Sequence, residues 1–183
     1  MLDAKFDSFD IKSRYRIFSH GDATVNKDGD WLHITKEGKV SEGVKENKIY
    51  YPFSENGLAL VTNLEDESTI VIDTDYKEVF KIEAKYELNF YIRESIDGFA
   101  ISPFINGLLM VNTPDDTVMY LNESGESVLE TESKYDRCTD FSKGLAAVRL
   151  EETEKWGFIN REGDLVIEAK YDNWGLDYAR KEE

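Results

Sequence analysis

Several features that indicate secretion or insertion into a membrane are scarce or missing in this sequence. It contains one cysteine, Cys138, so no intramolecular disulfide can form, which fits a reducing compartment. Three prolines and twelve glycines argue against low-complexity linkers. No apolar run approaches the length needed to cross a bilayer, and the opening stretch MLDAKFDSFDIKSRYR lacks the apolar core of a secretory signal. These absences predict a soluble cytoplasmic protein.

Basic residues are also in short supply. The chain has 22 Lys and Arg against 38 Asp and Glu, which gives a formal net charge of −16. Binding to a nucleic-acid backbone or to an anionic membrane needs a Lys/Arg surface, so we expect neither. The charge has two interpretations: a surface that keeps the protein soluble, or a surface matched to a basic protein partner.

Side-chain patterns that would assign a reaction are missing as well. The only histidines are His20 and His33, and no Cys/His cluster has the spacing of a metal site. Gly-rich phosphate loops, nucleophile elbows and zincin helices are not found. The sequence therefore predicts no metal, no cofactor and no catalytic residue. We expect a protein that is not an enzyme, and a carboxylate-based hydrolase is the enzymatic alternative.

What the sequence does have is internal repetition, in three phrases that recur in order. The first phrase reads FSHGDATV from 18, FSENGLALV from 53, FINGLLMV from 104 and FSKGLAAV from 141. The second reads WLHITKEGKV from 31, TIVIDTDYKEV from 69, VMYLNESGESV from 118 and WGFINREGDLV from 156. The third reads EAKYE from 83, ESKYD from 132 and EAKYD from 168.

Each phrase predicts a local structure. The first is a short strand entered from a glycine, and the second is an aromatic and β-branched strand followed by a tight turn and a third strand. The Lys-Tyr-Asp phrase leads to the next unit. We predict an all-β single domain, 1–183, of about four antiparallel meanders that stack because one small sheet is not stable alone. The predicted units are about 18–52, 53–103, 104–140 and 141–183, with 1–17 as an N-terminal cap strand.

The unit in residues 141–172 resembles the WG repeat, a bacterial β-hairpin repeat. The resemblance is weaker in the other units, where Val118 and Met119 replace Trp-Gly, Tyr76 stands at the turn glycine, and Leu32 follows Trp31. It implies a repeat architecture and brings no catalytic residues. Such units build either an open twisted array, which we expect because the units are unequal, or a closed propeller-like ring. Gly98–Ile101 in the insertion 88–103 is a candidate extra strand, and Trp174 opens a partial fifth unit.

Other single features have a structural and a functional interpretation. Trp31, Trp156 and Trp174 either pack between sheets or stack on a sugar or peptide ligand. Residues 26–30 resemble part of a calcium loop but lack its full frame, and Asp28-Gly29 is a strong hairpin turn. His20 stands at a position occupied elsewhere by Asn and Lys, which favours an exposed turn over a catalytic base.

Acidic residues recur at one place in the repeat, between the first and second phrases. Because stacked repeats place equivalent loops on one edge, we expect these residues to form one surface. This predicted acidic rim consists of Glu65, Asp66, Glu67, Asp115, Asp116, Glu151, Glu152 and Glu154.

Two functional hypotheses follow. The first is a protein-binding module that receives a basic partner on the acidic rim, for example an immunity-type inhibitor that masks the basic active site of a toxin such as a nuclease. The second is a carbohydrate or envelope-ligand binding module that uses the repeat tryptophans. The sequence does not specify the oligomeric state.

Overall fold

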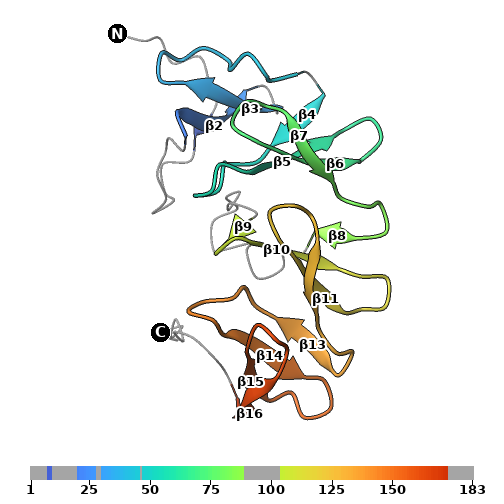
Figure 1. Cartoon of the computed structure of the whole chain (residues 1–183). Coiled ribbons are helices and arrows are strands. Elements are labelled where there is room, and N and C mark those ends of the chain that lie inside the picture. Colours follow the sequence, from blue (N-terminus) through green and yellow to red (C-terminus); the bar gives the residue numbers. More distant parts are fainter. Residues whose placement is uncertain (1–7, 10–19, 28–29, 46, 89–103, 173–183) are drawn as a thin grey trace, which may run out of the picture.

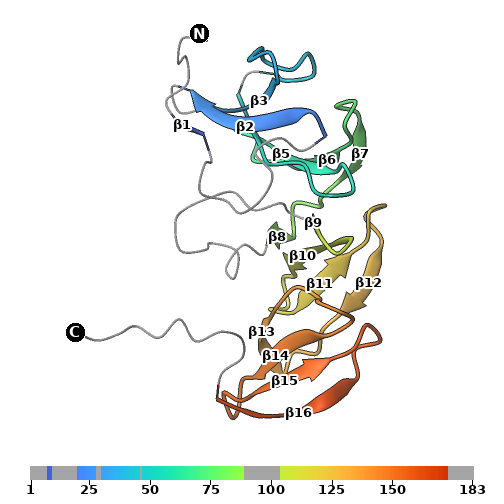
Figure 2. The same ribbon diagram turned by 90° about the vertical axis from the view of Figure 1, so that its left-hand side faces the viewer.

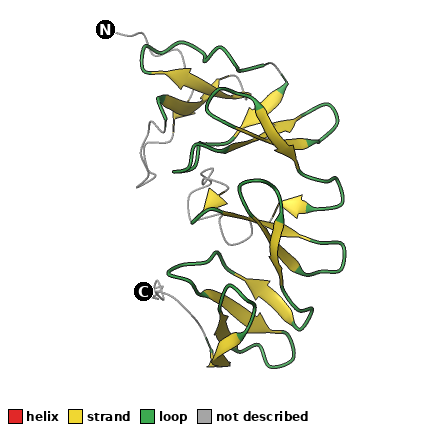
Figure 3. Ribbon diagram, in the orientation of Figure 1, coloured by secondary structure: helices red, strands yellow, loops and turns green. Residues whose placement is uncertain are grey.

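The structure, a computed structural model, describes residues 8–9, 20–27, 30–45, 47–88 and 104–172, and these contain strands and loops but no helix (Figure 3). All strand pairs are antiparallel. The first sheet consists of β1 (Ser8–Phe9), β2 (Asp22–Lys27) and β3 (Asp30–Thr35). The second consists of β4 (Lys48–Tyr50), β5 (Ala59–Asn63), β6 (Thr69–Ile72) and β7 (Glu78–Lys81).

The third sheet consists of β8 (Glu87–Leu88), β9 (Phe104–Ile105), β10 (Leu108–Asn112), β11 (Val118–Leu121) and β12 (Ser127–Glu130). The fourth consists of β13 (Tyr135–Cys138), β14 (Ala146–Leu150), β15 (Trp156–Ile159) and β16 (Leu165–Tyr171). The sheets follow one another in chain order, with the first and fourth at opposite ends of the stack (Figures 1 and 2). The predicted all-β open array is confirmed, and the described strands do not close into a ring.

The sheets are offset by one strand from the phrases of the sequence. A phrase unit begins at Phe-x-x-Gly, whereas the second, third and fourth sheets begin with the strand before it: β4, β8 and β13. The first two Lys-Tyr phrases form a turn and then the first strand of the following sheet. The third one, 168–172, instead extends β16, where Tyr171 pairs with Trp156 of the same sheet.

The core lies between the sheets. Side chains alternate along a strand, so a strand between two sheets buries both sets. On β10, Leu108 and Met110 pack toward the fourth sheet, and Leu109 and Val111 pack toward the second. This double burial explains why the phrases read as continuous apolar runs and not as alternating ones.

Tight turns fix the register of the hairpins. In the Phe-x-x-Gly phrase, the third residue and the glycine form the centre of a turn. Both have positive φ, as a primed hairpin turn requires, at His20-Gly21, Asn106-Gly107 and Lys143-Gly144. The turn glycine of the second phrase also has positive φ, for example 89° at Gly163. Tyr76 takes this position in the second sheet with a φ of 61°, a conformation that usually favours glycine.

Some predicted features lie outside the described residues. These are the candidate strand Gly98–Ile101 with the insertion around it, Trp174, and the N-terminal cap apart from β1. The hairpin interpretation of residues 26–30 agrees with the pairing of β2 and β3, which continues to the pair Lys27 and Asp30.

Candidate functional site

The acidic loops occupy equivalent places in three sheets. Each one joins two neighbouring strands of its sheet: 64–68 joins β5 and β6, 113–117 joins β10 and β11, and 151–155 joins β14 and β15. All three lie along one edge of the stack, at the right in Figure 1. Every predicted rim residue is exposed, and together they are Glu65, Asp66, Glu67, Asp115, Asp116, Glu151, Glu152 and Glu154.

One acidic residue in each loop adopts the same left-handed conformation. The φ angles are 57° at Glu67, 58° at Asp116 and 55° at Glu154. The loops therefore share a left-handed acidic residue as well as a charge, although the closing backbone bond spans five residues from Asn63 and from Leu150 but four from Thr113. In the first two loops the preceding Asn63 or Thr113 side chain also accepts backbone N–H groups of the loop.

Three lysines near this edge are already paired with carboxylates. Lys134 binds Glu132 at 2.7 Å and Lys85 binds Glu83 at 3.0 Å, while Lys155 pairs with Asp172. The rim carboxylates Glu67, Asp115 and Glu152 take part in no ion pair among the described residues. The edge therefore presents unpaired negative charge, and opposite charge on a partner is attracted over about 10 Å at 0.1 M salt.

Of the tryptophans that would bind a glycan, the structure describes the side-chain exposure of Trp156. Trp156 on β15 is 8% exposed, which agrees with the packing interpretation. Trp31 lies on β3, opposite Asn26, and Trp174 lies outside the described residues. His20 is exposed in its turn, where Nε2 lies 3.0 Å from the carbonyl oxygen of Ser54.

His33 is buried in an aromatic cluster that links the first two sheets. Its Nε2 donates to the carbonyl oxygen of Tyr51 at 2.9 Å, and its Nδ1 lies 3.1 Å from the Tyr76 hydroxyl, which donates to Asp22 Oδ2 at 2.6 Å. Burial lowers the pKa of His33, although the Tyr51 carbonyl and Asp22 act in the opposite direction. Burial and the bond to Asp22 raise the pKa of Tyr76. The cluster is structural, since His33 is 1% exposed.

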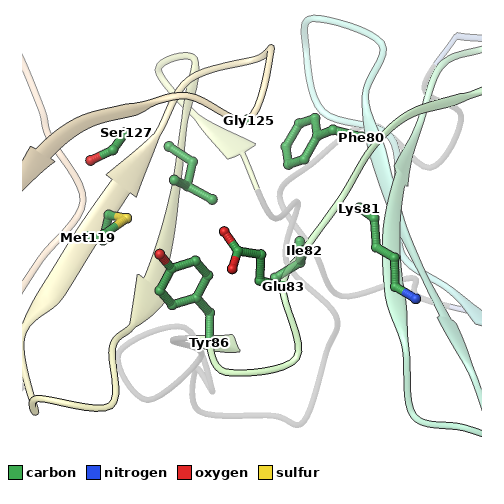
Figure 4. A pocket seen from close by; sticks show the side chains of 9 residues that line it. Phe80, Lys81, Ile82, Glu83, Tyr86, Met119, Gly125 and Ser127 are labelled. Atoms are coloured by element: carbon green, nitrogen blue, oxygen red, sulfur yellow. The ribbon is translucent and has the colours of Figure 1, made fainter.

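A small pocket lies between the second and third sheets, and the repeat phrases do not predict it. It has a volume of about 170 Å³. Ile82, Glu83 and Tyr86 border it from the connection after β7, and Met119 and Leu121 border it from β11 (Figure 4). Sequence reasoning missed it because it depends on how far apart two sheets pack.

Metal and thiol chemistry find no support in the described part of the chain. No group of three or more His, Cys, Asp or Glu side chains there could hold a metal ion. Cys138 is 1% exposed, and burial raises its thiol pKa to about 12, so it is inert at neutral pH. The described residues also contain no helix that could cross a membrane.

The repeat geometry agrees with a comparison against known families. The family described as "WG containing repeat" matches residues 119–153 and 156–174. Residues 119–174 are two adjacent WG-type repeats. These repeats correspond to the strands from β11 to β16, so the predicted family resemblance is confirmed there. A search among curated proteins found no match.

The solved structures that match this chain include a designed protein. The crystal structure of the computationally designed Ika8 protein has a TM-score of 0.47 and 16% sequence identity to this chain. The similarity covers 81% of this chain and 46% of that chain. This chain thus spans about half the length of the designed protein it matches.

Proposed function

We propose that this β-repeat module is not an enzyme and that it binds a basic protein through its acidic rim. The observation that supports the proposal is the placement of three exposed acidic loops on one edge of the stack, with one left-handed acidic residue in each. A surface of this kind steers a basic partner toward it and raises the association rate at low salt. The immunity-type form, in which the partner is a toxin with a basic active site, is the specific version that we favour.

The test reverses one charge in each acidic loop. Glu67→Lys, Asp115→Lys and Glu152→Lys change side chains that form no described ion pair, and Lys143 shows that lysine fits a left-handed position. A matched control reverses three exposed acids in turns of the opposite edge: Glu55→Lys, Asp75→Lys and Glu162→Lys. Both triple variants change the net charge equally, and the control also breaks the exposed ion pair of Asp75 with Lys77, whose Oδ2 and Nζ lie 3.2 Å apart.

The measurement begins with the tagged protein in its native host. A stoichiometric partner that dissociates as salt rises is identified, purified and titrated against the three proteins. We expect the rim variant to lose at least about tenfold in affinity, mostly through slower association, and the control variant to change far less. Equal affinities for the rim and control variants would rule out the acidic rim as the binding surface. Recovery of the protein alone would argue against a tight protein partner.

A further inference from the structure

The pocket between the second and third sheets has an apolar floor. Ile82, Met119 and Leu121 form it, and they are between 5% and 8% exposed. Pockets for drug-sized ligands measure roughly 300–1,000 Å³, so a pocket of about 170 Å³ has room for one side chain and not for a cofactor or an oligosaccharide. An occupant must therefore be a single group that brings apolar surface with it.

Aromatic rings form the two sides of this pocket. Phe80 on β7 lies against Gly125 in the turn after β11, so closely that a Cβ on Gly125 would be 2.6 Å from the ring. Tyr86 borders the other side and packs against the same core cluster. Ring faces carry negative charge density, which favours a cation or a flat delocalised group between them.

One carboxylate completes the lining. Figure 4 shows the carboxylate of Glu83 directed into the middle of the lining residues, whereas Lys81 points away. Glu83 now binds Lys85, with Oε2 and Nζ 3.0 Å apart, and Lys85 Nζ lies 4.8 Å from the centre of the Tyr86 ring. The carboxylate and the ring thus already hold a cation from within the chain.

We infer that this pocket binds an arginine side chain of the partner protein. This inference rests on the proposed function, because it names the anchor that a basic partner would insert beside the acidic rim. The three methylenes of arginine would cover the apolar floor, and the guanidinium would stack on Tyr86 and bind Glu83 through two N–H groups. A lysine ammonium is a strongly hydrated point charge that neither stacks nor binds in a fork, so arginine suits the site better.

Displacing Lys85 costs little. The side chains of Lys85 and Glu83 are 51% and 64% exposed, so their pair is an exposed ion pair of small net stability. Lys85 can move into solvent while a guanidinium takes its place. Lys85 is therefore a competitor for the site, and its removal should strengthen binding.

The next junction along the stack provides a matched control. Glu132, Lys134 and Tyr135 repeat the arrangement, with Lys134 Nζ 2.7 Å from Glu132 and 5.0 Å from the ring centre of Tyr135. Tyr135, however, is 2% exposed and packs in the core between the third and fourth sheets. Its ring has no face left for a ligand, so this copy should not bind arginine.

The experiment uses methyl NMR of the full chain with labelled methionine. The sequence has three methionines, of which Met119 lines the pocket and Met110 lies in a different core cluster. The probe is Nα-acetyl-arginine amide, and its neutral analogue Nα-acetyl-citrulline amide is the control ligand. We expect a saturable shift of the Met119 methyl with the arginine probe, little with citrulline, and none at Met110.

Three variants complete the test. Glu83→Gln should lower the affinity for the arginine probe about tenfold, since a charge-assisted hydrogen bond is lost. Glu132→Gln should leave the affinity unchanged, and Lys85→Ala should raise it. A Met119 methyl that does not respond, or responds equally to citrulline, would overturn the inference.

The failure of this inference and that of the proposed function are distinguishable. If the rim variant loses the partner while the arginine probe does not bind, the proposed function stands and the pocket assignment falls. If the probe binds but the partner binds the rim and control variants with the same affinity, the pocket is a binding site and the acidic rim is not. A partner that binds Glu83→Gln as tightly as the natural chain would show that its arginine does not enter the pocket.

Discussion

Glycine positions in this chain serve two different physical purposes. Gly144 has a φ of 85° and nothing within 4 Å of a Cβ, so glycine is needed there for backbone conformation. Gly157, the glycine of the Trp-Gly pair, does not have a positive φ. A Cβ there would lie 2.6 Å from the carbonyl oxygen of Ile167 and 2.8 Å from the backbone nitrogen of Ala169. Gly157 therefore lets β16 approach β15 closely where their register shifts.

These two roles predict different effects of the same substitution. Gly144→Ala should cost about 1–2 kcal/mol of unfolding free energy through backbone strain alone. Gly157→Ala should cost about 3 kcal/mol, because backbone atoms of β16 must move. Urea unfolding measures both losses, and hydrogen exchange separates them: residues 165–171 should lose protection in Gly157→Ala only. Similar exchange in the two variants would contradict the close-approach role.

Tyr76 shows how a side chain can override a turn preference. Its left-handed backbone costs on the order of 1 kcal/mol, but its ring packs on Phe53 and its hydroxyl binds Asp22. Gly43 is adapted to it, since a Cβ at Gly43 would overlap the ring at 2.0 Å. The sequence could show that glycine was missing, but not that a cluster from another sheet compensates for it.

Burial of His33 predicts a dependence of stability on pH. The unfolded chain binds a proton on this histidine near pH 6.5, whereas the folded chain binds it only at lower pH, because burial lowers the pKa. Between these values the unfolded state holds more protons. The contribution of His33 to stability is therefore complete above about pH 6.5 and is lost as pH falls through the folded pKa.

The measurement is the urea midpoint at several pH values between 7.5 and 5.5. His33→Gln should lower the midpoint at pH 7.5 and flatten its decline toward acid. His20→Asn is the matched control, since His20 is exposed and Asn occupies the equivalent turn at Asn106. The control should keep the slope of the natural chain. A slope that persists in His33→Gln would assign the pH dependence to other groups.

At the scale of strands and sheets, hydrogen bonds between neighbouring sheets supplement the apolar contacts. Tyr120 on β11 is fully buried, and its hydroxyl donates to the carbonyl oxygen of Thr139 beside the fourth sheet at 2.7 Å. Its ring meets Phe141 edge to face at 4.9 Å between centres. Asn106 makes a second hydrogen bond between these two sheets: its Nδ2 donates to the carbonyl oxygen of Phe141 at 2.7 Å.

Removal of the Tyr120 hydroxyl isolates one of these bonds. Tyr120→Phe keeps the ring contact but leaves the Thr139 carbonyl without that donor in a buried place, so we expect a loss of about 1–2 kcal/mol. Asn106→Gly removes the second bond at a more exposed position without straining the left-handed backbone there, where φ is 52°, and should cost less. Thermal or urea unfolding measures both changes. A neutral Tyr120→Phe variant would mean that water or backbone movement satisfies the carbonyl.

The strands themselves were predictable from the sequence, because apolar runs and turn residues are local signals. The assignment of each strand to a sheet was less so. The phrases suggested that Lys-Tyr-Asp only connects units, whereas the first two copies contribute β8 and β13 to the following sheet. Nothing local distinguishes the third copy, which stays on β16. β8 and β13 are defined by their pairing with β10 and β14 of the following sheet, and such pairing is a long-range property.

One part of the candidate site was also predictable from the sequence, and another part was not. The acidic loops were predictable because they repeat, and equivalent loops of a stack share an edge. The pocket was not, because its members Phe80, Glu83 and Met119 come from two sheets and none is conspicuous in sequence. Met119 stands where the fourth sheet has Gly157, so the departure from the repeat pattern was the one available sequence signal.

For the molecule as a whole, net charge is the dominant long-range term. A formal charge of −16 on an elongated stack repels itself along its length, and salt screens this repulsion. We predict that the melting temperature rises between about 0.01 and 0.3 M NaCl. The variant Glu67→Lys, Asp115→Lys, Glu152→Lys reduces the repulsion and should show a smaller rise.

Differential scanning calorimetry over the salt series measures this effect. Potassium fluoride in place of sodium chloride serves as the control, because screening depends on ionic strength and not on a particular ion. A melting temperature that stays constant or falls with salt would mean that local ion pairs, such as Arg149 with Asp136, outweigh the general repulsion.

The one-strand offset between phrases and sheets has a consequence for how such a chain changes length. Three of the four sheets combine a strand from one phrase unit with strands from the next, so a segment copied at a phrase boundary does not correspond to a self-contained sheet. The order of strands repeats along the chain, however. The insertion of one complete repeat length at any position therefore restores the pattern and adds one sheet. A tandem duplication of DNA therefore need not respect any boundary of the fold, and unequal recombination can lengthen or shorten the stack in whole steps.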